Sequence, residues 1–409
     1  MKTDLRKIRK AAIVLANLSE NRRNLFLYHL ARIIDKRKLQ IVEANKIDLL
    51  NAKKNKLSES FMQRLNFDIT AINSMQERVQ SLKKLKSDIG QIIDYKRSRD
   101  GLVIKKVRVP LGVLLAIYES RPEVTVDMAT LCIKSGNSMI LKGGSDAKNT
   151  NKALHDCIKT ALKKTNLPKE TVHMISSRSE IKKMLARNND IDLVVARGSY
   201  SMVKSVLDNS TIPVLAHASG GARIFVDKSA DLAIAEKILI NSKASKPSAC
   251  NSLDTIVVHQ EIAKKFLSKI VPILVSLGIR VIGDGKVNRI VKAEMAKEKD
   301  WDIEFLGLTV SIKIIKDVIE ASKFINEHSK KHSEGIITTD KKAIKYFTNT
   351  IDCAALFVNC SPRLHDGYIF GLGAEMGIAT GKLHARGPVG LKELTTYKWE
   401  IYGKGHIRK

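Results

Sequence analysis

A short polar loop, SKPSACNSLDT over 245–255, carries a cysteine among residues that suit a reactive thiol. Free cysteines usually pack as small hydrophobic residues, so a structural thiol is the simpler explanation for any one of them. A nucleophilic cysteine needs cations, dipoles and backbone donors around its thiolate. Lys243 and Lys246 precede Cys250, Asn251 follows it, and small neighbours leave room for a substrate. The loop predicts a nucleophile, although no histidine adjoins it as a papain-like site would require.

Two glycine turns look suited to bind phosphate groups. In MILKGGSDAKN, a predicted strand ends at Lys142 and runs into Gly143 and Gly144. In LVVARGSYSMV, a second strand ends before Gly198 and Ser199. Each turn leads into a helix whose first N–H groups can bind an anion. One such turn is more simply a plain loop, but two in one parallel sheet favour a dinucleotide site, held without the common G-x-G-x-x-G fingerprint.

The elements that must position these residues follow an α/β pattern. Apolar residues at helical spacing predict helices from 2 to about 86. IIDYKRSRDGLVIKKVRV predicts a two-stranded arm over 92–109, with a type I′ turn at Asp100-Gly101. Strands and helices alternate from about 110, and the same order restarts after about 241. Such repetition implies an α/β protein with two parallel-sheet domains, each covered on both faces, plus a small β arm.

Composition excludes several classes of protein. The chain has 409 residues, 44% of them hydrophobic, which suffices for the cores of two or three domains. Its longest apolar runs, such as PLGVLLAIY, fall short of the roughly 20 residues of a membrane helix, so no membrane span is expected. The net charge of +29 comes from lysines scattered along a chain with few aromatic residues, which indicates a solvated surface and no nucleic-acid partner. The cysteines lack paired spacing, which predicts no metal site and a cytoplasmic location; they are residues 132, 157, 250, 353 and 360.

Four stretches resemble the γ-glutamyl phosphate reductase family of the aldehyde dehydrogenase superfamily. They follow the family's order along nearly the whole chain and are VPLGVLLAIYESRPEVTVDMATLCIKSGNSMILKGGSDA (109–147), NSKASKPSACNSLDT (241–255), HSKKHSEGIITTD (328–340) and FGLGAEMGIATGKLHARGPVGLKELTTYKWEIYGKGHIR (370–408). YESRP, the cysteine loop and KLHARGP are the specific parts. The resemblance implies an aldehyde dehydrogenase-like fold, with a cofactor-binding domain over 1–91 and 110–242, a catalytic domain over 243–375, and an oligomerisation arm and tail over 92–109 and 388–409.

The resemblance also implies an activity, the NADPH-dependent reduction of γ-glutamyl phosphate to glutamate 5-semialdehyde and phosphate in proline biosynthesis. In the family, the cysteine that matches Cys250 attacks the acyl phosphate, phosphate leaves, and hydride from NADPH reduces the thioester. Ser120 or Asn251 would supply the side-chain donor of the oxyanion hole. A homo-oligomer is implied, in which the arm pairs with the tail of another subunit, as is a functional pairing with glutamate 5-kinase.

Three further residues are candidates for binding the substrate. Arg121 lies in YESRP, and His384 and Arg386 lie in LHARGP, where a structural role is equally compatible with their types. The planar guanidinium of arginine can donate two parallel hydrogen bonds to a carboxylate or a phosphate. Lys142 at a strand's carboxyl end would contact the 2′-phosphate of the cofactor. This predicts a modest preference for NADPH over NADH.

The stretch HASGGARIFVD (217–227) separates two related activities. It matches the turn in which oxidising members carry a water-activating glutamate, and it has no carboxylate before its glycines. This favours the reductase over an NAD(P)-dependent semialdehyde dehydrogenase that forms a free acid. A non-catalytic binding protein of the same fold is disfavoured because Cys250, Lys142 and YESRP are all present.

The same stretch also departs from the family, whose turn typically reads H-L-D-G-I-C-H. The unusual residues are Ser219, Gly221, Ala222 and Arg223. Gly198-Ser199-Tyr200 likewise replaces a more glycine-rich turn. Drift is the simpler interpretation of both departures, and altered contact with the cofactor is the functional one.

Overall fold

The computed structural model describes residues 3–216 and 219–408. The chain forms two compact units, of which unit 1 comprises 1–218, 370–377 and 383–409, and unit 2 comprises 219–369 and 378–382. His217 and Ala218, the first two residues of the HASGGAR stretch, lie outside the described residues. Within the described ranges, no helix combines the length and the apolar character needed to cross a membrane.

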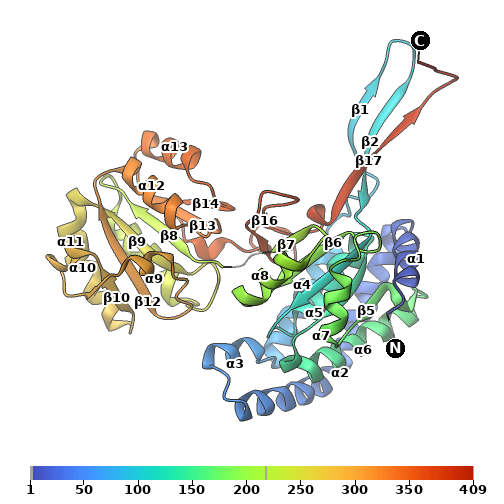
Figure 1. Cartoon of the computed structure of the whole chain (residues 1–409), viewed down its shortest axis with the longest axis horizontal. Helices are drawn as coiled ribbons and strands as arrows, with labels where there is room; N and C mark the ends of the chain where they lie inside the picture. Colours follow the sequence, from blue (N-terminus) through green and yellow to red (C-terminus); the bar gives the residue numbers. More distant parts are fainter. Residues whose placement is uncertain (1–2, 217–218, 409) are drawn as a thin grey trace. The chain divides into compact units, whose positions relative to one another are not determined.

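Unit 1 is built on a five-stranded parallel sheet of order β5-β4-β3-β6-β7 (Figure 1). Its strands are β3 (Val113–Tyr118), β4 (Ser138–Lys142), β5 (Val172–Met174), β6 (Leu193–Arg197) and β7 (Val214–Ala216). Every residue of β3 and β4 is buried, because helices cover both faces of the sheet. This is the continuous apolar strand pattern that parallel sheets require.

The helices of unit 1 divide between the two faces. One face of the sheet shares a core with α1 (Leu5–Ala16), α7 (Arg178–Met184) and α8 (Tyr200–Asn209). The other carries α5 (Val124–Lys134) and α6 (Lys148–Lys164). The predicted amino-terminal helices pack beyond these as α2 (Glu20–Lys54), α3 (Glu59–Leu65) and α4 (Ile69–Lys84).

Unit 2 has a seven-stranded parallel sheet of order β11-β10-β12-β9-β8-β13-β14. Its strands are β8 (Ala222–Val226), β9 (Leu253–His259), β10 (Arg280–Gly283), β11 (Glu294–Met295), β12 (Thr309–Ile315), β13 (Ser333–Ile337) and β14 (Ala355–Val358). Side chains alternate between two cores, so that Ile224 and Val226 pack on one face and Phe225 on the other. The first core includes α9 (Leu232–Ala244), α10 (Gln260–Ser276) and α11 (Gly285–Asn288); the second includes α12 (Val318–His328) and α13 (Lys341–Thr350).

The border between the units differs from the predicted domain border at 242. β8 and α9 belong to unit 2, because β8 is hydrogen-bonded between β9 and β13 in the larger sheet. The residues 370–375, which the sequence placed in the catalytic domain, lie in unit 1. The Gly220-Gly221 turn therefore belongs to the same unit as the cysteine loop.

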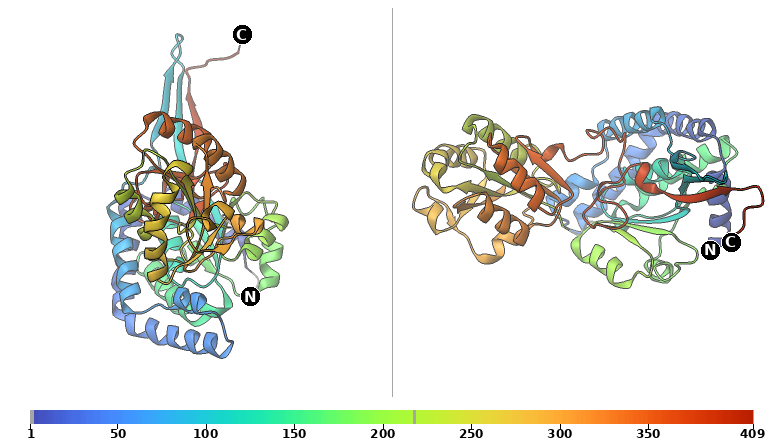
Figure 2. Two further views of the ribbon diagram at one scale, coloured as in Figure 1. Left: turned by 90° about the vertical axis from the view of Figure 1, so that its left-hand side faces the viewer. Right: turned by 90° about the horizontal axis from the view of Figure 1, so that it is seen from above.

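The arm of unit 1 is a three-stranded antiparallel sheet that projects from its body (Figure 1; Figure 2 shows it from two further sides). β1 (Ile92–Arg97) and β2 (Val103–Pro110) are joined by residues 98–102, so the predicted two-residue type I′ turn is wrong. Ser98 N–H donates to the Leu102 carbonyl over 2.9 Å and closes this longer loop. The tail strand β17 (Thr395–Tyr402) pairs with β2 of its own chain, whereas the sequence predicted pairing with another subunit.

Candidate active site

A cavity of about 510 Å³ lies in unit 1 at the carboxyl ends of β3, β4 and β6. Ligands of parallel sheets bind at this edge, because strand ends and helix starts converge there. Lys142, Gly144 and Ser199 line the cavity, and Gly143 and Gly198 are their chain neighbours. The structure thus brings the predicted cofactor-binding residues together.

Neither glycine turn has space for a side chain at Gly143 or Gly198. A Cβ on Gly143 would lie 2.2 Å from Asn151 Nδ2, and one on Gly198 would lie 2.4 Å from Met202 Cε. The Ser199 N–H donates to Glu119 Oε2 over 2.7 Å, which ties the second turn to the end of β3. The glycines therefore permit close packing inside unit 1, and the helices that begin after the turns beside the cavity suit the pyrophosphate of a dinucleotide.

The charges in this cavity are of both signs. Lys142 is 7% exposed, and its Nζ donates to the Gly143 carbonyl over 2.8 Å. Asp146 accepts from Ser120 Oγ over 3.3 Å, and Lys182 of α7 also lines the cavity. Ser120 has φ of 51°, a left-handed conformation that is uncommon for a residue with a side chain and that is often found at functional sites.

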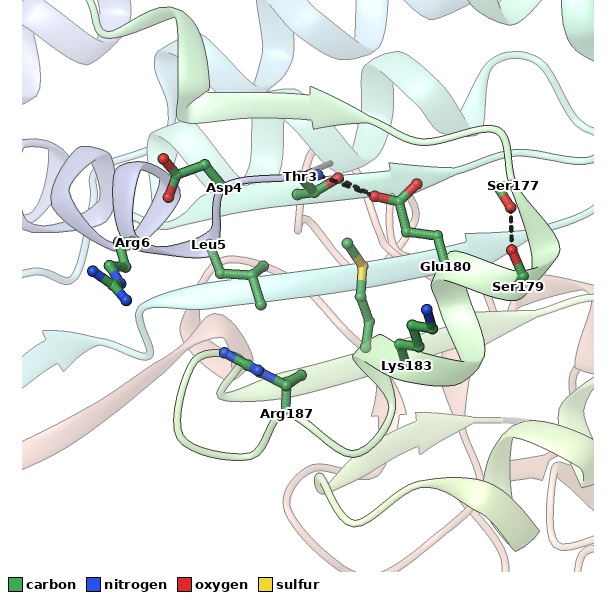
Figure 3. A pocket seen from close by; sticks show the side chains of 10 residues that line it. Thr3, Asp4, Leu5, Arg6, Ser177, Ser179, Glu180, Lys183 and Arg187 are labelled. Carbon is green, nitrogen blue, oxygen red and sulfur yellow. Dashed lines mark hydrogen bonds between the residues drawn. The ribbon is translucent and has the colours of Figure 1, made fainter. Parts of the chain in front are cut away.

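A larger cavity of about 800 Å³ lies elsewhere in unit 1, between the start of α1 and α7 (Figure 3). Glu180 on its wall accepts from Thr3 Oγ1 over 2.5 Å, and Arg187 forms an ion pair with Asp190 over 2.6 Å. The predicted site residues do not line it. Since its polar groups are already engaged with one another or exposed, size alone does not make it the candidate active site.

The cysteine loop lies in unit 2 between the end of α9 and the start of β9, at the amino edge of the sheet. Cys250 is half-buried, whereas Cys132 and Cys157 of unit 1 are buried. Burial raises the pKa of both of those thiols, which keeps them protonated and unreactive. Cys353 and Cys360 are half-buried as well, but the Cys353 Sγ donates to the Ala355 carbonyl, and burial raises the pKa of the Cys360 thiol. The polar loop with Lys246 and Asn251 distinguishes Cys250 as the candidate nucleophile.

The Gly220-Gly221 turn packs directly against this cysteine. The Gly221 N–H donates to the Cys250 carbonyl over 2.6 Å. A Cβ on Gly220 would lie 2.2 Å from the same carbonyl oxygen, and one on Gly221 would lie 2.1 Å from Asp254 Oδ2. The turn that departs from the family pattern therefore shapes the cysteine loop from within unit 2.

A second segment, SPRLHDG over 361–367, clamps the loop through side chains. Asn251 is 5% exposed; its Nδ2 donates to the His365 carbonyl over 3.0 Å, and its Oδ1 accepts from Arg363 Nη1. Arg363 Nε donates to Ser245 Oγ over 3.2 Å, at the other end of the loop. His365 is anchored in turn, because its Nδ1 lies 2.8 Å from Ser333 Oγ at the start of β13. Arg363 and His365 thus belong to the site although the sequence analysis missed them.

Four buried charged side chains lie behind the loop. Arg223 faces Glu334 with 3.6 Å between Nη1 and Oε1, and Lys243 faces Asp254 with 3.5 Å between Nζ and Oδ1. Burial raises the pKa of Asp254 to about 6 and that of Glu334 to about 7, although the paired cations oppose the shift. A register shift between β8 and β9 at Asp254 turns this side chain toward the glycine turn.

The predicted substrate residues lie in unit 1. Arg121 is half-buried and precedes α5. Burial raises the pKa of the neighbouring Glu123, and the positive charge of Arg121 partly opposes this rise. His384 is exposed, and its Nε2 lies 2.5 Å from the Glu393 carbonyl. Arg386 is half-buried two residues further along. These placements leave the substrate role of the three residues a prediction.

Comparisons with known proteins agree with this fold. The sequence matches the aldehyde dehydrogenase family over residues 3–287. It is 43% identical to the γ-glutamyl phosphate reductase of Thermotoga sp. strain RQ2, over 99% of this chain and 98% of that protein. The crystal structure of γ-glutamyl phosphate reductase from Thermotoga maritima has a TM-score of 0.95 and 42% identity, and each chain is covered to 99%. An acetylating aldehyde dehydrogenase from Geobacillus thermoglucosidasius shares the fold, with a TM-score of 0.71 at 15% identity over 99% of this chain and 96% of that chain.

The chain therefore belongs to the aldehyde dehydrogenase family and, within it, to the γ-glutamyl phosphate reductases. The predicted resemblance and α/β fold are confirmed. Members of this family are oxidoreductases that use a nicotinamide cofactor. The close-packed glycine turns and the cavity of unit 1 fit such a cofactor.

Proposed function

We propose that this chain reduces γ-glutamyl phosphate to glutamate 5-semialdehyde and phosphate, with Cys250 as the nucleophile. The observation that carries the proposal is the half-buried Cys250, whose loop is fixed by Gly221 on one side and by Arg363 on the other. Fixing a nucleophile in one geometry removes much of the entropic part of the barrier. Family membership supplies the substrate, which is that of the relatives named above.

The chemistry begins when the Cys250 thiolate attacks the acyl carbon of the substrate. A C–S bond forms, the C–O bond to the phosphoryl group breaks, and inorganic phosphate leaves with the electron pair. The Cys250 backbone N–H and the Asn251 amide N–H that does not bind the His365 carbonyl would bind the developing oxyanion. A bound nicotinamide cofactor supplies the hydride that reduces the thioester. Release of the semialdehyde then regenerates the thiolate.

The cofactor preferred in this proposal is NADPH, held by the backbone of the turns at Gly143-Gly144 and Gly198-Ser199. Lys142 and Lys182 add positive charge to the cavity. Glu119 and Asp146 lie in the same cavity and oppose the binding of an extra phosphate. The preference for NADPH over NADH is therefore modest.

The acid-forming semialdehyde dehydrogenase is the alternative activity, and the glycine turn opposes it. No carboxylate of 219–221 is available to activate water, and the nearby Asp254 and Glu334 are buried against Lys243 and Arg223. The thioester is therefore consumed by hydride or, in reverse, by phosphate.

We also propose that the chain assembles at least as a dimer through its arm. Tyr397, Trp399 and Ile401 of β17 are 50%, 50% and 58% exposed, which makes this sheet suitable for covering by another subunit. Light scattering tests the assembly: deleting residues 395–409 should lower the mass, and a monomeric intact chain would contradict the proposal. A reducing cytoplasm suits the five free cysteines, and glutamate 5-kinase is the enzyme with which we expect a functional pairing.

The deciding experiment for the activity follows the reverse reaction by nucleotide absorbance. Glutamate 5-semialdehyde and oxidised cofactor are mixed with phosphate, or with sulfate at the same ionic strength. We expect turnover only with phosphate, because no base is placed to recruit water. Oxidation in sulfate at the same rate would instead identify the acid-forming dehydrogenase.

A further inference from the structure

The cysteine loop contains no histidine, and the nearest sequence candidates for a supporting cation are lysines. Lys246 lies in the loop itself but is exposed, so solvent screens its charge. Lys243 is buried at the end of α9, and its Nζ faces Asp254 over 3.5 Å. Neither lysine therefore provides a poorly screened positive charge for the thiolate.

Arg363 is half-buried, so solvent screens its charge less than that of Lys246, and it contacts the loop at two places. Its Nε donates to Ser245 Oγ over 3.2 Å, and its Nη1 donates to Asn251 Oδ1. Ser245 opens the loop and Asn251 directly follows Cys250, so the planar guanidinium spans both ends of the loop. Nη2 carries two further N–H groups, which a planar fork holds in a fixed direction.

The guanidinium is also electrostatically coupled to the cysteine. Burial lowers the pKa of Arg363, and the negative charges of the Cys250 thiolate and Asp366 raise it. Such coupling is reciprocal, because a charge that is stabilised by the thiolate stabilises the thiolate equally.

The backbone of Arg363 is itself held in place. Its N–H donates to Ser361 Oγ over 3.3 Å, and that hydroxyl lies 3.0 Å from Ser242 Oγ on α9. Two residues further along, His365 contacts Ser333 of β13. The arginine is therefore fixed between α9 and β13 and is not a mobile surface group.

We propose that Arg363 holds Cys250 as a thiolate and fixes the cysteine loop in its reactive geometry. The inference rests on the proposed nucleophilic role of Cys250 and assigns the cation that this role requires. Arg363 keeps the thiolate charged through the guanidinium, and it positions the loop through Ser245 and Asn251.

Other charged groups around the loop act on Cys250 as well. The loop and α9 carry Lys246 and Lys243, and the strands β8, β9 and β13 carry Arg223, Asp254 and Glu334. Glu304 precedes β12, and His365 and Asp366 lie beside Arg363. The buried ones are paired with each other, as Arg223 is with Glu334. Unlike these pairs, Arg363 contacts the loop itself at Ser245 and Asn251, on either side of Cys250.

The test measures the alkylation of Cys250 by iodoacetamide as a function of pH, in the full-length chain and without substrate or cofactor. The modified 250 peptide is quantified by mass spectrometry, which separates it from the other cysteines. In Arg363→Met we expect the midpoint to rise by at least about one pH unit, which lowers the rate at pH 7 roughly tenfold. Arg363→Lys should keep a low midpoint because it retains the charge, but it should lose turnover because it lacks the fork.

Lys246→Met is the matched control, and its alkylation profile should follow the unmodified chain. An unchanged midpoint in folded Arg363→Met would overturn the proposal, as would a rise in Arg363→Lys equal to that in Arg363→Met. If Arg363→Met does not fold, Arg363→Gln replaces it with the same expected rise, and thermal unfolding identifies the folded variants. Because alkylation needs no turnover, failure here is separate from failure of the proposed activity, which phosphate dependence tests.

Discussion

The two regions that carry the chemistry lie at opposite edges of their own sheets. In unit 1 the glycine turns follow the carboxyl ends of β4 and β6, whereas in unit 2 the cysteine loop precedes the amino end of β9. The first region is built on two glycine turns in which an added Cβ would clash, with Glu119, Lys142 and Asp146 lining the cavity beside them. The second is formed by side chains, with Arg363 and Asn251 in contact above buried charged pairs.

The difference shows that the two sites are specified in different ways. A backbone turn depends on residues that are adjacent in the sequence, so its position follows from local pattern. The cysteine loop depends on partners more than 100 residues away, such as His365 for Asn251. Buried ion pairs there add little net stability, since desolvation offsets their attraction.

The largest expected effect concerns the cysteine region alone. Cys250→Ser should lower turnover by at least on the order of 10³-fold, because a hydroxyl does not ionise near neutral pH. Binding of NADPH, measured by fluorescence titration, should remain, since the turns of unit 1 are untouched. Cys353→Ser, in the same unit, is the control and should keep near-normal turnover. Comparable activity in both variants would remove Cys250 from the mechanism.

A substitution in the glycine turn tests how rigidly the cysteine is placed. In Gly220→Ala, the new Cβ would meet the Cys250 carbonyl oxygen at 2.2 Å, so the loop must move. We expect turnover to fall roughly 10- to 100-fold, with little change in NADPH affinity. Gly285→Ala places its Cβ in open space and should be silent. Normal turnover in Gly220→Ala would mean that the turn does not set the geometry of the nucleophile.

The matching test of the cofactor region is Lys142→Ala. If Lys142 contacts the 2′-phosphate, a charge-assisted contact contributes about 1 to 3 kcal/mol. Steady-state kinetics with both cofactors should then show the ratio of NADPH to NADH efficiency falling roughly 5- to 150-fold. Lys148→Ala, an exposed lysine at the start of α6, provides the comparison and should leave the ratio unchanged. A ratio near one in the unmodified chain would eliminate the role of Lys142.

The smallest effect is a pH dependence of stability that comes from the buried charges. The pKa of Glu334 is raised from 4.5 to about 7 by burial, so the folded chain binds this proton more tightly than the unfolded chain. Between these values the contribution of Glu334 to the free energy of unfolding falls as pH rises. Glu334→Gln lacks this titration, so its stability relative to the unmodified chain should increase from pH 5 to pH 8.

Urea unfolding at the two pH values measures this difference. Glu327→Gln replaces an exposed carboxyl on α12 and serves as the control, with a much smaller change. A stability difference for Glu334→Gln that is the same at both pH values would show that Glu334 is ionised throughout.

The sequence predicted the parallel sheets, the glycine turns and the cysteine loop well, because each has a local signature. The end of strand β4 was predicted correctly at Lys142, since an apolar run stops there before Gly143. β8 was missed and its segment was assigned to the wrong side of the domain border, because only its pairing with β9 and β13 places it.

Arg363 and His365 show most clearly what local pattern does not reveal. Their loop follows β14 but returns to the amino edge of the sheet, where His365 meets Ser333. The sequence did contain a clue to this loop. Arg363 lies between a proline and a glycine in a short segment that follows a predicted strand. Its partner could not be inferred, because the contact with Asn251 spans more than 100 residues.

The most direct test of the account is to trap the acyl group on Cys250. The chain is mixed with glutamate 5-semialdehyde and oxidised cofactor without phosphate, quenched in acid and digested, and the cysteine peptides are weighed by mass spectrometry. We predict a γ-glutamyl thioester on the Cys250 peptide, because no base is placed to hydrolyse it, and its disappearance when phosphate is added before the quench. An adduct on another cysteine, or free glutamate formed without phosphate and with no adduct on Cys250, would contradict the account.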